Sequence, residues 1–172
     1  MIIKLIIILN IAFFSCYPKS TLEIRQDDFD ESLNYFLHNN ILISNTTGHS
    51  IELNIQKSIS KDGIAHLLNI DCLSSNKIGF DKLEYVTIEI DNQKYDFEPY
   101  LKKKAIKLDE DLVFETLSIL TDVQLIKKIA YGNDIKIKIA GDKKIVYSRL
   151  GLENKINMQN YFETFIPFIN QF

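Results

Sequence analysis

Hydrophobic and polar residues alternate with a period of two along much of the chain, and this is the pattern of half-buried β-strands. The clearest stretch runs from Ile51 to Gln56, where apolar and polar side chains take turns. Similar runs predict further strands at 64–73, 86–90, 95–97, 112–119, 135–139 and 144–150. Turn sequences stand between several of them, at Lys61-Asp62-Gly63, Asp91-Asn92 and Gly141-Asp142. Connections this short indicate hairpins.

Three other stretches follow helical spacing. The acidic run 27–31 suits a helix N-terminus, and the apolar residues after it recur every three or four positions until Asn39-Asn40. The apolar positions of this first predicted helix are Phe29, Leu33, Phe36 and Leu37.

The second predicted helix has the stronger local signal. Thr121 and Gln124 have the spacing of a capping box, and Gly132 stands where a helix end favours a left-handed residue. Its apolar stripe is Leu125, Ile126, Ile129 and Ala130. A third helix is predicted over 155–166, ending or kinking before Pro167. Its apolar face is Met158, Tyr161, Phe162, Phe165, Ile166 and Ile169.

These elements predict an α+β fold: a mostly antiparallel sheet of about seven strands with two or three packed helices. Parallel pairing needs long crossovers, which most neighbouring strands here lack. The helices around 121–131 and 155–166 are expected to cover one face of the sheet. We assign residues 27–172 to this single domain.

The N-terminus has a different pattern. Lys4 is followed by an apolar run from Leu5 to Phe14, interrupted by Asn10. The run is about ten residues long, whereas a membrane-spanning helix needs about twenty. A charged start, a short apolar core and a small residue, Ser15, are typical of a secretory signal peptide, which we assign to residues 1–15. The alternative is an uncleaved core helix or short anchor.

The sequence Phe13-Phe14-Ser15-Cys16 resembles the relaxed lipobox of bacterial lipoproteins, in the form found in spirochaetes and Bacteroidetes. The resemblance covers residues 1 to about 20 and implies that Cys16 receives a diacylglyceryl thioether and becomes the new N-terminus. Residues 16–26 would then be the lipidated cysteine and its tether. Tyr17 stands where an aspartate favours inner-membrane retention in enterobacterial lipoproteins, which implies an outer-membrane destination. Cleavage by the ordinary signal peptidase is the open alternative.

Charge and cysteine content narrow the possible partners. Without residues 1–15 the chain carries about four more acidic than basic side chains, which argues against sequence-independent binding of nucleic acid. The basic cluster Lys102-Lys103-Lys104 with Lys107 is expected to be a solvated loop. If Cys16 is acylated, Cys72 has no intramolecular partner. We expect Cys72 to be a small buried residue, the alternatives being an intermolecular disulfide or a reactive thiol.

Candidate chemistry is sparse. The spacings between His38, His49 and His66 match no metal-ligand motif, and no nucleophile elbow, phosphate loop or dinucleotide fingerprint occurs. We therefore expect no metal and no cofactor. His66 is the one weak catalytic candidate, because it shares a predicted strand face with four apolar residues. Hydrogen bonding in the core is the competing interpretation.

The C-terminal end is rich in aromatic residues. Core packing accounts for Tyr161, Phe162 and Phe165, whereas Phe168 and Phe172 are weak candidates for an exposed patch that binds a partner.

The leading hypothesis is a lipid-anchored, non-enzymatic module of a bacterial cell envelope, which contacts an envelope or host protein and no nucleic acid. The first alternative is an envelope binding protein for a small apolar or peptide ligand. The second is a hydrolase that uses His66 with a nearby carboxylate or with Cys72. The third is an assembly factor for other envelope proteins.

Overall fold

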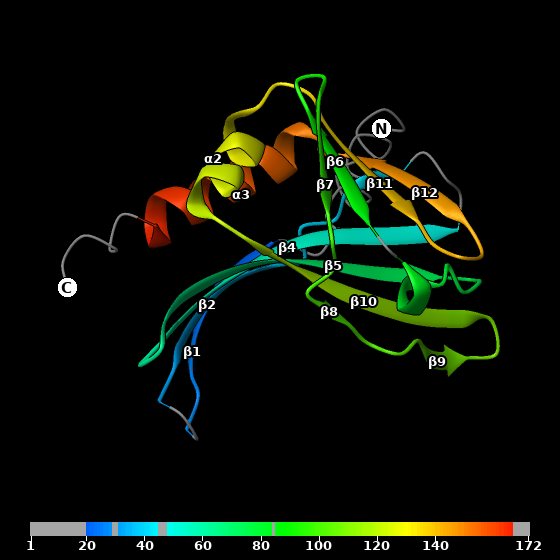
Figure 1. Ribbon diagram of the computed structural model, residues 1–172, viewed down its shortest axis with the longest axis horizontal. Helices are drawn as coiled ribbons and strands as arrows, with labels where there is room; N and C mark the ends of the chain where they lie inside the picture. Colours follow the sequence, from blue (N-terminus) through cyan, green and yellow to red (C-terminus); the bar gives the residue numbers. More distant parts are fainter. Residues whose placement is uncertain (1–19, 29–30, 45–47, 84, 167–172) are drawn as a thin grey trace, which may run out of the picture.

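The computed structural model describes residues 20–28, 31–44, 48–83 and 85–166. These residues form two antiparallel sheets and two α-helices (Figure 1). Sheet A contains β1 (Thr21–Gln26), β2 (Leu33–His38), β4 (His49–Ser60), β5 (Gly63–Ser74), β8 (Leu101–Lys102), β9 (Ile106–Asp109) and β10 (Leu112–Thr121). Sheet B contains β3 (Ile43–Ser44), β6 (Val86–Ile90), β7 (Gln93–Phe97), β11 (Ile135–Ala140) and β12 (Ile145–Arg149). The helices are the 3₁₀ turn η1 (Phe80–Lys82), α2 (Val123–Tyr131) and α3 (Leu152–Phe165).

Sheet A is built on the alternation seen in the sequence. Its strands are ordered β1-β2-β4-β5-β10, and β10 pairs with both β8 and β9 at the far side. Ile51, Leu53 and Ile55 of β4 are fully buried. Their polar neighbours lie on the opposite face, because successive side chains of a strand point to opposite sides. Sheet A therefore has one apolar inner face and one polar outer face.

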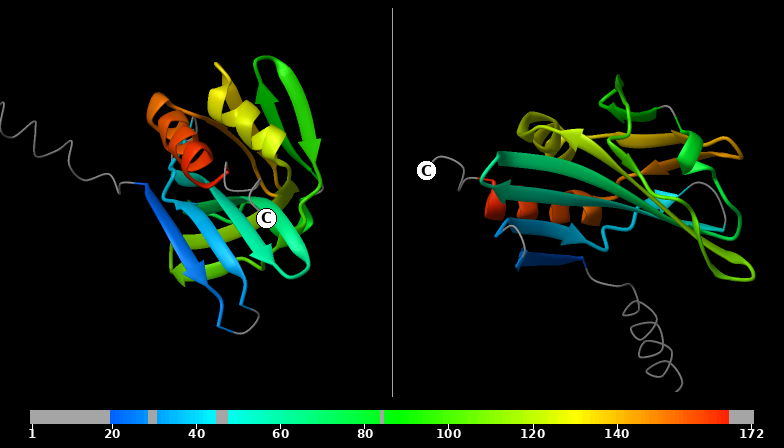
Figure 2. Two further views of the ribbon diagram at one scale, coloured as in Figure 1. Left: turned by 90° about the vertical axis from the view of Figure 1, so that its left-hand side faces the viewer. Right: turned by 60° about the horizontal axis from the view of Figure 1, so that its bottom comes forward.

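The other layer consists of sheet B and the two helices. Sheet B is ordered β3-β12-β11-β6-β7, and β11 places Ile135, Ile137 and Ile139 in the core. Helices α2 and α3 lie side by side next to sheet B, over the inner face of sheet A (Figures 1 and 2). Met158 and Tyr161 of α3 are fully buried. The core thus lies between sheet A and this mixed layer.

The predicted fold class is confirmed: the chain is α+β, and every strand pairing among the described residues is antiparallel. The hairpin through Asp91-Asn92 is confirmed, and both turn residues have positive φ. A second sheet was not foreseen from the sequence. The loop between β11 and β12 covers residues 141–144, because Ala140 pairs with Ile145, so the predicted two-residue turn is wrong.

The helix predicted from the acidic run to Asn39-Asn40 is wrong. Residues 21–26 and 33–38 pair instead as the antiparallel strands β1 and β2. Leu33, Tyr35 and Leu37 also fit a period of two, and short apolar runs cannot distinguish a strand from a helix. Pairing of β2 with β4 on its other side selects the strand. The hairpin begins at Thr21, so the folded part starts within the range that the sequence analysis assigned to the tether.

Helix α2 is confirmed, but its ends differ from the prediction. The N-cap is Asp122, whose carboxyl oxygen accepts the Leu125 N–H at 2.7 Å, and not Thr121. Asp122 can accept this bond because its backbone is extended and the third helical amide points back at it. Gly132 ends the helix with φ −64°, so it does not take the left-handed conformation expected of it.

Candidate functional site

Three of the residues singled out in the sequence, Cys16, Phe168 and Phe172, lie outside the described residues. The lipidation site and the aromatic patch therefore stay predictions. His66 and Cys72 are both described, and both lie on β5 with their side chains in the interior.

His66 lies on the inner face of sheet A and is only 6% exposed. Its cross-strand neighbours are Lys57 on β4 and Thr121 on β10. The His66 Nδ1 and Thr121 Oγ1 atoms are buried and have no hydrogen-bond partner. Burial lowers the pKa of His66, the charge of Lys57 lowers it further, and Asp122 opposes both. A neutral imidazole with a free nitrogen is a chemically competent base, but it is enclosed by the core.

Lys57 explains why this part of the interior is polar. Its side chain is 1% exposed, and its Nζ atom donates to the Phe165 carbonyl oxygen at 2.8 Å. That carbonyl belongs to the last turn of α3, where a cation is favoured by the helix dipole. Tyr161 supports the same junction, because its hydroxyl donates to the Tyr35 carbonyl oxygen at 3.2 Å. These contacts fix α3 to sheet A, which is a structural role.

Cys72 is not a partner for His66. The two residues are six positions apart on one strand, which separates them by about 20 Å. Burial, with a smaller contribution from the nearby Glu115 carboxyl, raises the pKa of the Cys72 thiol to about 12. A thiol of this kind is protonated at neutral pH and is a poor nucleophile. The structure thus separates the two components of a cysteine–histidine hydrolase.

Glu115 on β10 is a second buried polar group, and all its contacts are structural. Its two carboxyl oxygens accept the backbone N–H groups of Ile78, Gly79 and Phe80, at 2.6, 2.9 and 3.0 Å. The carboxyl therefore holds the loop that leads into η1. No oxygen is directed at an open cavity by these bonds, so Glu115 is not a candidate acid or base.

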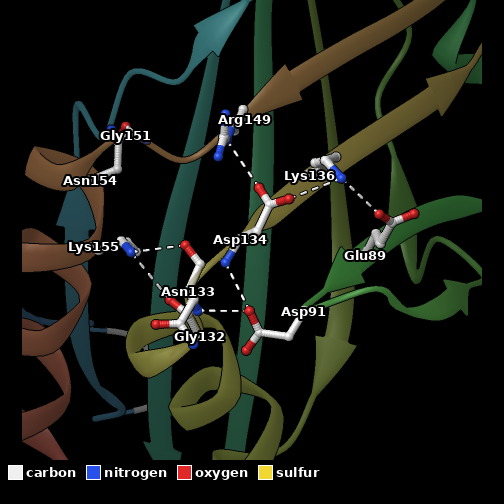
Figure 3. Close-up of polar contacts among 10 residues, drawn as sticks. All are labelled: Glu89, Asp91, Gly132, Asn133, Asp134, Lys136, Arg149, Gly151, Asn154 and Lys155. Carbon is white, nitrogen blue, oxygen red and sulfur yellow. Dashed lines mark hydrogen bonds and ion pairs between the residues drawn. The ribbon is translucent and has the colours of Figure 1, made fainter.

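A charged network lies at the junction of α2 and β11 (Figure 3). The Asp91 carboxyl accepts the N–H groups of Asn133 and Asp134, both at 2.9 Å. The Asp134 carboxylate pairs with Lys136 and Arg149, each at 3.0 Å. Hydrogen bonding to Lys136 lowers the pKa of Asp134, with Arg149 contributing in the same direction. Since these charges satisfy one another, the network favours joining elements over binding a ligand.

A cleft with a volume of about 680 Å³ lies beside β3 and the start of α3. It combines amide and apolar side chains, among them Asn39, Ile41, Ile43, Leu152, Asn154 and Asn157. His49 also lines it, and its Nε2 atom is 2.7 Å from Lys144 Nζ. Burial lowers the pKa of His49, and Lys144 adds to this effect. The volume is within the range of small-molecule sites.

The β1 edge is the second candidate surface, and we use this name for the side of Thr21–Gln26 that faces away from β2. β1 is the terminal strand of sheet A (Figure 2). Asp27 donates its N–H to the Ser32 carbonyl at 2.8 Å, so this pair bonds across the hairpin. Hydrogen-bonded and non-bonded pairs alternate in antiparallel sheets. The backbone groups of Leu22, Ile24 and Gln26 therefore point to the open side.

The side chains of β1 are also available. Leu22 is 42% exposed and Ile24 is 56% exposed, both on the inner face at the margin of the sheet. On the outer face Arg25 donates two hydrogen bonds to the Glu23 carboxylate, at 2.6 and 2.8 Å. Arg25 lowers the pKa of Glu23, and His38 contributes a smaller effect. The edge thus carries one negative and one positive charge at neutral pH.

Sequence reasoning missed this edge. The alternation Thr21-Leu22-Glu23-Ile24-Arg25 was the available signal, but the segment was assigned to the tether. A six-residue segment cannot be assigned as a strand with an open edge until its pairing partner is known. That partner, β2, was itself predicted as a helix.

No group of three or more His, Cys, Asp or Glu side chains within the described ranges is arranged to hold a metal ion. Over the same part of the chain, no helix has the length and apolarity needed to cross a membrane. Comparisons with protein-family models, with curated proteins and with solved structures found no match.

Proposed function

We propose that this protein is a lipid-anchored component of a bacterial cell envelope that binds another protein chain through the β1 edge. The observation that carries the proposal is the edge itself: six residues, paired on one side, with two apolar side chains exposed. An open strand offers main-chain donors and acceptors to an added strand. This supports a function in binding.

The proposed anchor would place the β1 edge close to a membrane. Four residues lie between Cys16 and Thr21, and the five Cα–Cα steps from one to the other span at most about 18 Å. The signal peptide and the lipobox resemblance support lipid attachment at Cys16, and Tyr17 supports the outer membrane as destination. The natural partners would then be proteins held at the same surface or reaching it.

Metabolic labelling tests the anchor. Producing cells are grown with a clickable palmitate analogue, and the wild type is compared with Cys16→Ala and with Cys72→Ala. We expect label on the wild type and on Cys72→Ala, none on Cys16→Ala, and loss of Cys16→Ala from the membrane fraction. Equal labelling of Cys16→Ala and wild type would refute an anchor at this cysteine.

Site-specific photocrosslinking tests the binding surface. A photoreactive residue replaces Leu22 on β1 or, as a control, Leu108 on β9, which is also exposed. We expect a discrete protein adduct from position 22 that disappears when Ile24→Pro is added. An adduct that survives Ile24→Pro, or arises equally from position 108, would contradict binding at the β1 edge.

A second candidate function is binding of a small apolar or peptide ligand, and the 680 Å³ cleft favours it. Native mass spectrometry of the protein extracted from membranes tests this function. A bound mass that is lost in Leu152→Arg, a change at the exposed cleft wall, would support it. A ligand-free protein, or a mass retained in Leu152→Arg, would count against it.

A further inference from the structure

We propose that the partner of the β1 edge is the β1 edge of a second copy, paired antiparallel so that the two A sheets become one continuous sheet. This inference rests on the proposed function, because it names the partner of the same surface. Three independent features of β1 support it: the direction of its free backbone groups, the order of its charges and its exposed apolar side chains.

The free backbone groups restrict how two copies can pair. Leu22, Ile24 and Gln26 direct their N–H and C=O groups outward, whereas the residues between them bond to β2. An antiparallel pair forms hydrogen bonds only where outward groups face outward groups. Residues 22, 24 and 26 of one copy must therefore lie opposite residues 22, 24 and 26 of the other, in some order.

Charge selects one of these registers. With Ile24 opposite the Ile24 of the second copy, each Glu23 faces an Arg25 across the interface. A shift of two residues in either direction places Glu23 against Glu23, or Arg25 against Arg25. Opposite charges across a strand pair are favourable and like charges are not. The non-bonded pairs bring side chains closest, and Glu23 and Arg25 occupy them in this register.

Contacts between apolar side chains also favour this register. Ile24 of each copy meets its equivalent, and Leu22 meets the stem of Gln26. Exposed apolar surface of Leu22 and Ile24 would be removed from water, which favours association. One strand pair gives a small interface, so confinement of both copies to a membrane surface would strengthen it by raising their effective concentration.

The other edges are less suited to self-pairing. β7 also alternates charges, at Lys94 and Asp96, but its Tyr95 and Phe97 already pack against the core, so pairing there would bury less exposed apolar surface. β3 has only two residues. The β8–β9 side is interrupted and carries several lysines.

Disulfide trapping in membranes of the producing cells tests the register. Cα atoms of a hydrogen-bonded pair are about 5.5 Å apart, within the range of a disulfide. We expect Ile24→Cys to form a covalent dimer under mild oxidation. Leu22→Cys alone should stay monomeric, and the double variant Leu22→Cys with Gln26→Cys should crosslink. Wild type reports any contribution of Cys16 and Cys72.

Charge exchange provides an independent test. Glu23→Arg gives a chain with two arginines, and Arg25→Glu gives a chain with two glutamates. Each variant alone should dimerise at least about tenfold more weakly than wild type, because like charges face each other. An equimolar mixture should recover association as a heterodimer, measured by sedimentation of the detergent-extracted proteins. A merely structural effect of either substitution would not be rescued by mixing.

The results separate this inference from the proposed function. Palmitate labelling without a dimer at position 24 overturns self-pairing and leaves another protein as the partner. If Ile24→Cys forms a dimer but the protein is not labelled by the palmitate analogue, self-pairing is supported and the lipid anchor is refuted. Crosslinking of Tyr95→Cys in place of Ile24→Cys would assign the interface to β7 and overturn the inference.

Discussion

The two edges of sheet A differ in how they are protected. On one side β1 is six regular residues with one acidic and one basic side chain, Glu23 and Arg25. On the other side β10 is covered by β8, with two residues, and β9, with four. The register shifts at Leu112 and Val113, where β9 joins β10. Residues 101–109 contain four lysines and one aspartate.

The two edges of sheet A differ in whether they are protected against pairing with another chain. Ile106 and Leu108 of β9 are exposed as well, so apolar surface alone does not distinguish the edges. Short strands, a bulge and lysines are the means by which proteins prevent edges from pairing. The β8–β9 side has all three, and β1 has none of them. An edge left open where the opposite edge is protected is suited to a partner.

The largest expected effect is at the protected side. Glu115→Ala would leave the buried N–H groups of Ile78, Gly79 and Phe80 without an acceptor. We expect a loss of about 3–5 kcal/mol in the free energy of unfolding, measured by urea titration. Glu110→Ala, an exposed change in the β9–β10 turn, is the control and should cost less than about 0.5 kcal/mol. A similar loss in the free energy of unfolding for both variants would show that Glu115 does not stabilise the loop that leads into η1.

Two proline substitutions on β1 test the direction of its backbone groups. Arg25→Pro removes an N–H that bonds to β2, whereas Ile24→Pro removes one that faces the open side. We expect the free energy of unfolding to fall by about 2 kcal/mol in the first variant and by less than about 1 kcal/mol in the second. Only Ile24→Pro should abolish the dimer without unfolding the chain. If Ile24→Pro were the more destabilising variant, the assignment of which β1 residues bond to β2 and which face the open side would be wrong.

An effect that depends on pH is expected in the interior between the edges. Burial and Lys57 lower the pKa of His66, so the unfolded chain binds a proton more readily than the folded chain. The stability that comes from a neutral His66 is present above about pH 6.5 and is lost as pH falls below it, by up to about 1.4 kcal/mol per pH unit. Urea unfolding at pH 7.5 and 5.5 should show a smaller loss for His66→Gln than for wild type.

His49 is the control for this experiment, because burial lowers its pKa too. His49→Gln should reduce the pH dependence independently of His66→Gln, and the two changes should add. If His66→Gln loses as much stability as wild type between the two pH values, His66 is not held neutral in the folded chain.

The smallest effect is expected from the lysines of the protected edge. The double change Lys103→Glu and Lys107→Glu should alter the free energy of unfolding by less than about 0.5 kcal/mol, because both side chains are exposed. We also expect no new association in an Ile24→Pro background, since the break between β8 and β9 would still prevent pairing. Dimers in sedimentation velocity would show that charge alone protects this edge.

The sequence predicted the elements whose pattern is strong and local. Strands β4, β5, β6 and β11 have clear alternation, and the stripe of α2 is unambiguous. The β1–β2 hairpin was missed because β1 was assigned to the tether and the residues of β2 fit two periods, between which contacts with β4 decide. The division into two sheets was missed because β3 pairs with β12, about a hundred residues away, and no local signal records that pairing.

The candidate sites were less predictable than the fold. His66 could be placed on an apolar face from spacing alone, but its neighbours Lys57 and Thr121 come from strands whose register the sequence does not specify. The burial of Lys57 depends on the end of α3, which reaches it from 108 residues away. Among the described residues no further strand lies beside β1, and this is a property of the assembled sheet.

The pairing of β3 with β12 has a consequence for the order of folding. Strands β1, β2, β4 and β5 are neighbours in space almost in chain order, so they can pair before the later part of the chain is in place. Strand β3 can pair only after β12 has formed, because Ile43 and Ser44 bond to Arg149 and Ser148. We expect this contact to form after the transition state, so that Ile43→Ala accelerates unfolding and leaves the refolding rate unchanged. If Ile43→Ala also refolds more slowly in stopped-flow measurements, the pairing of β3 with β12 is already formed in the transition state.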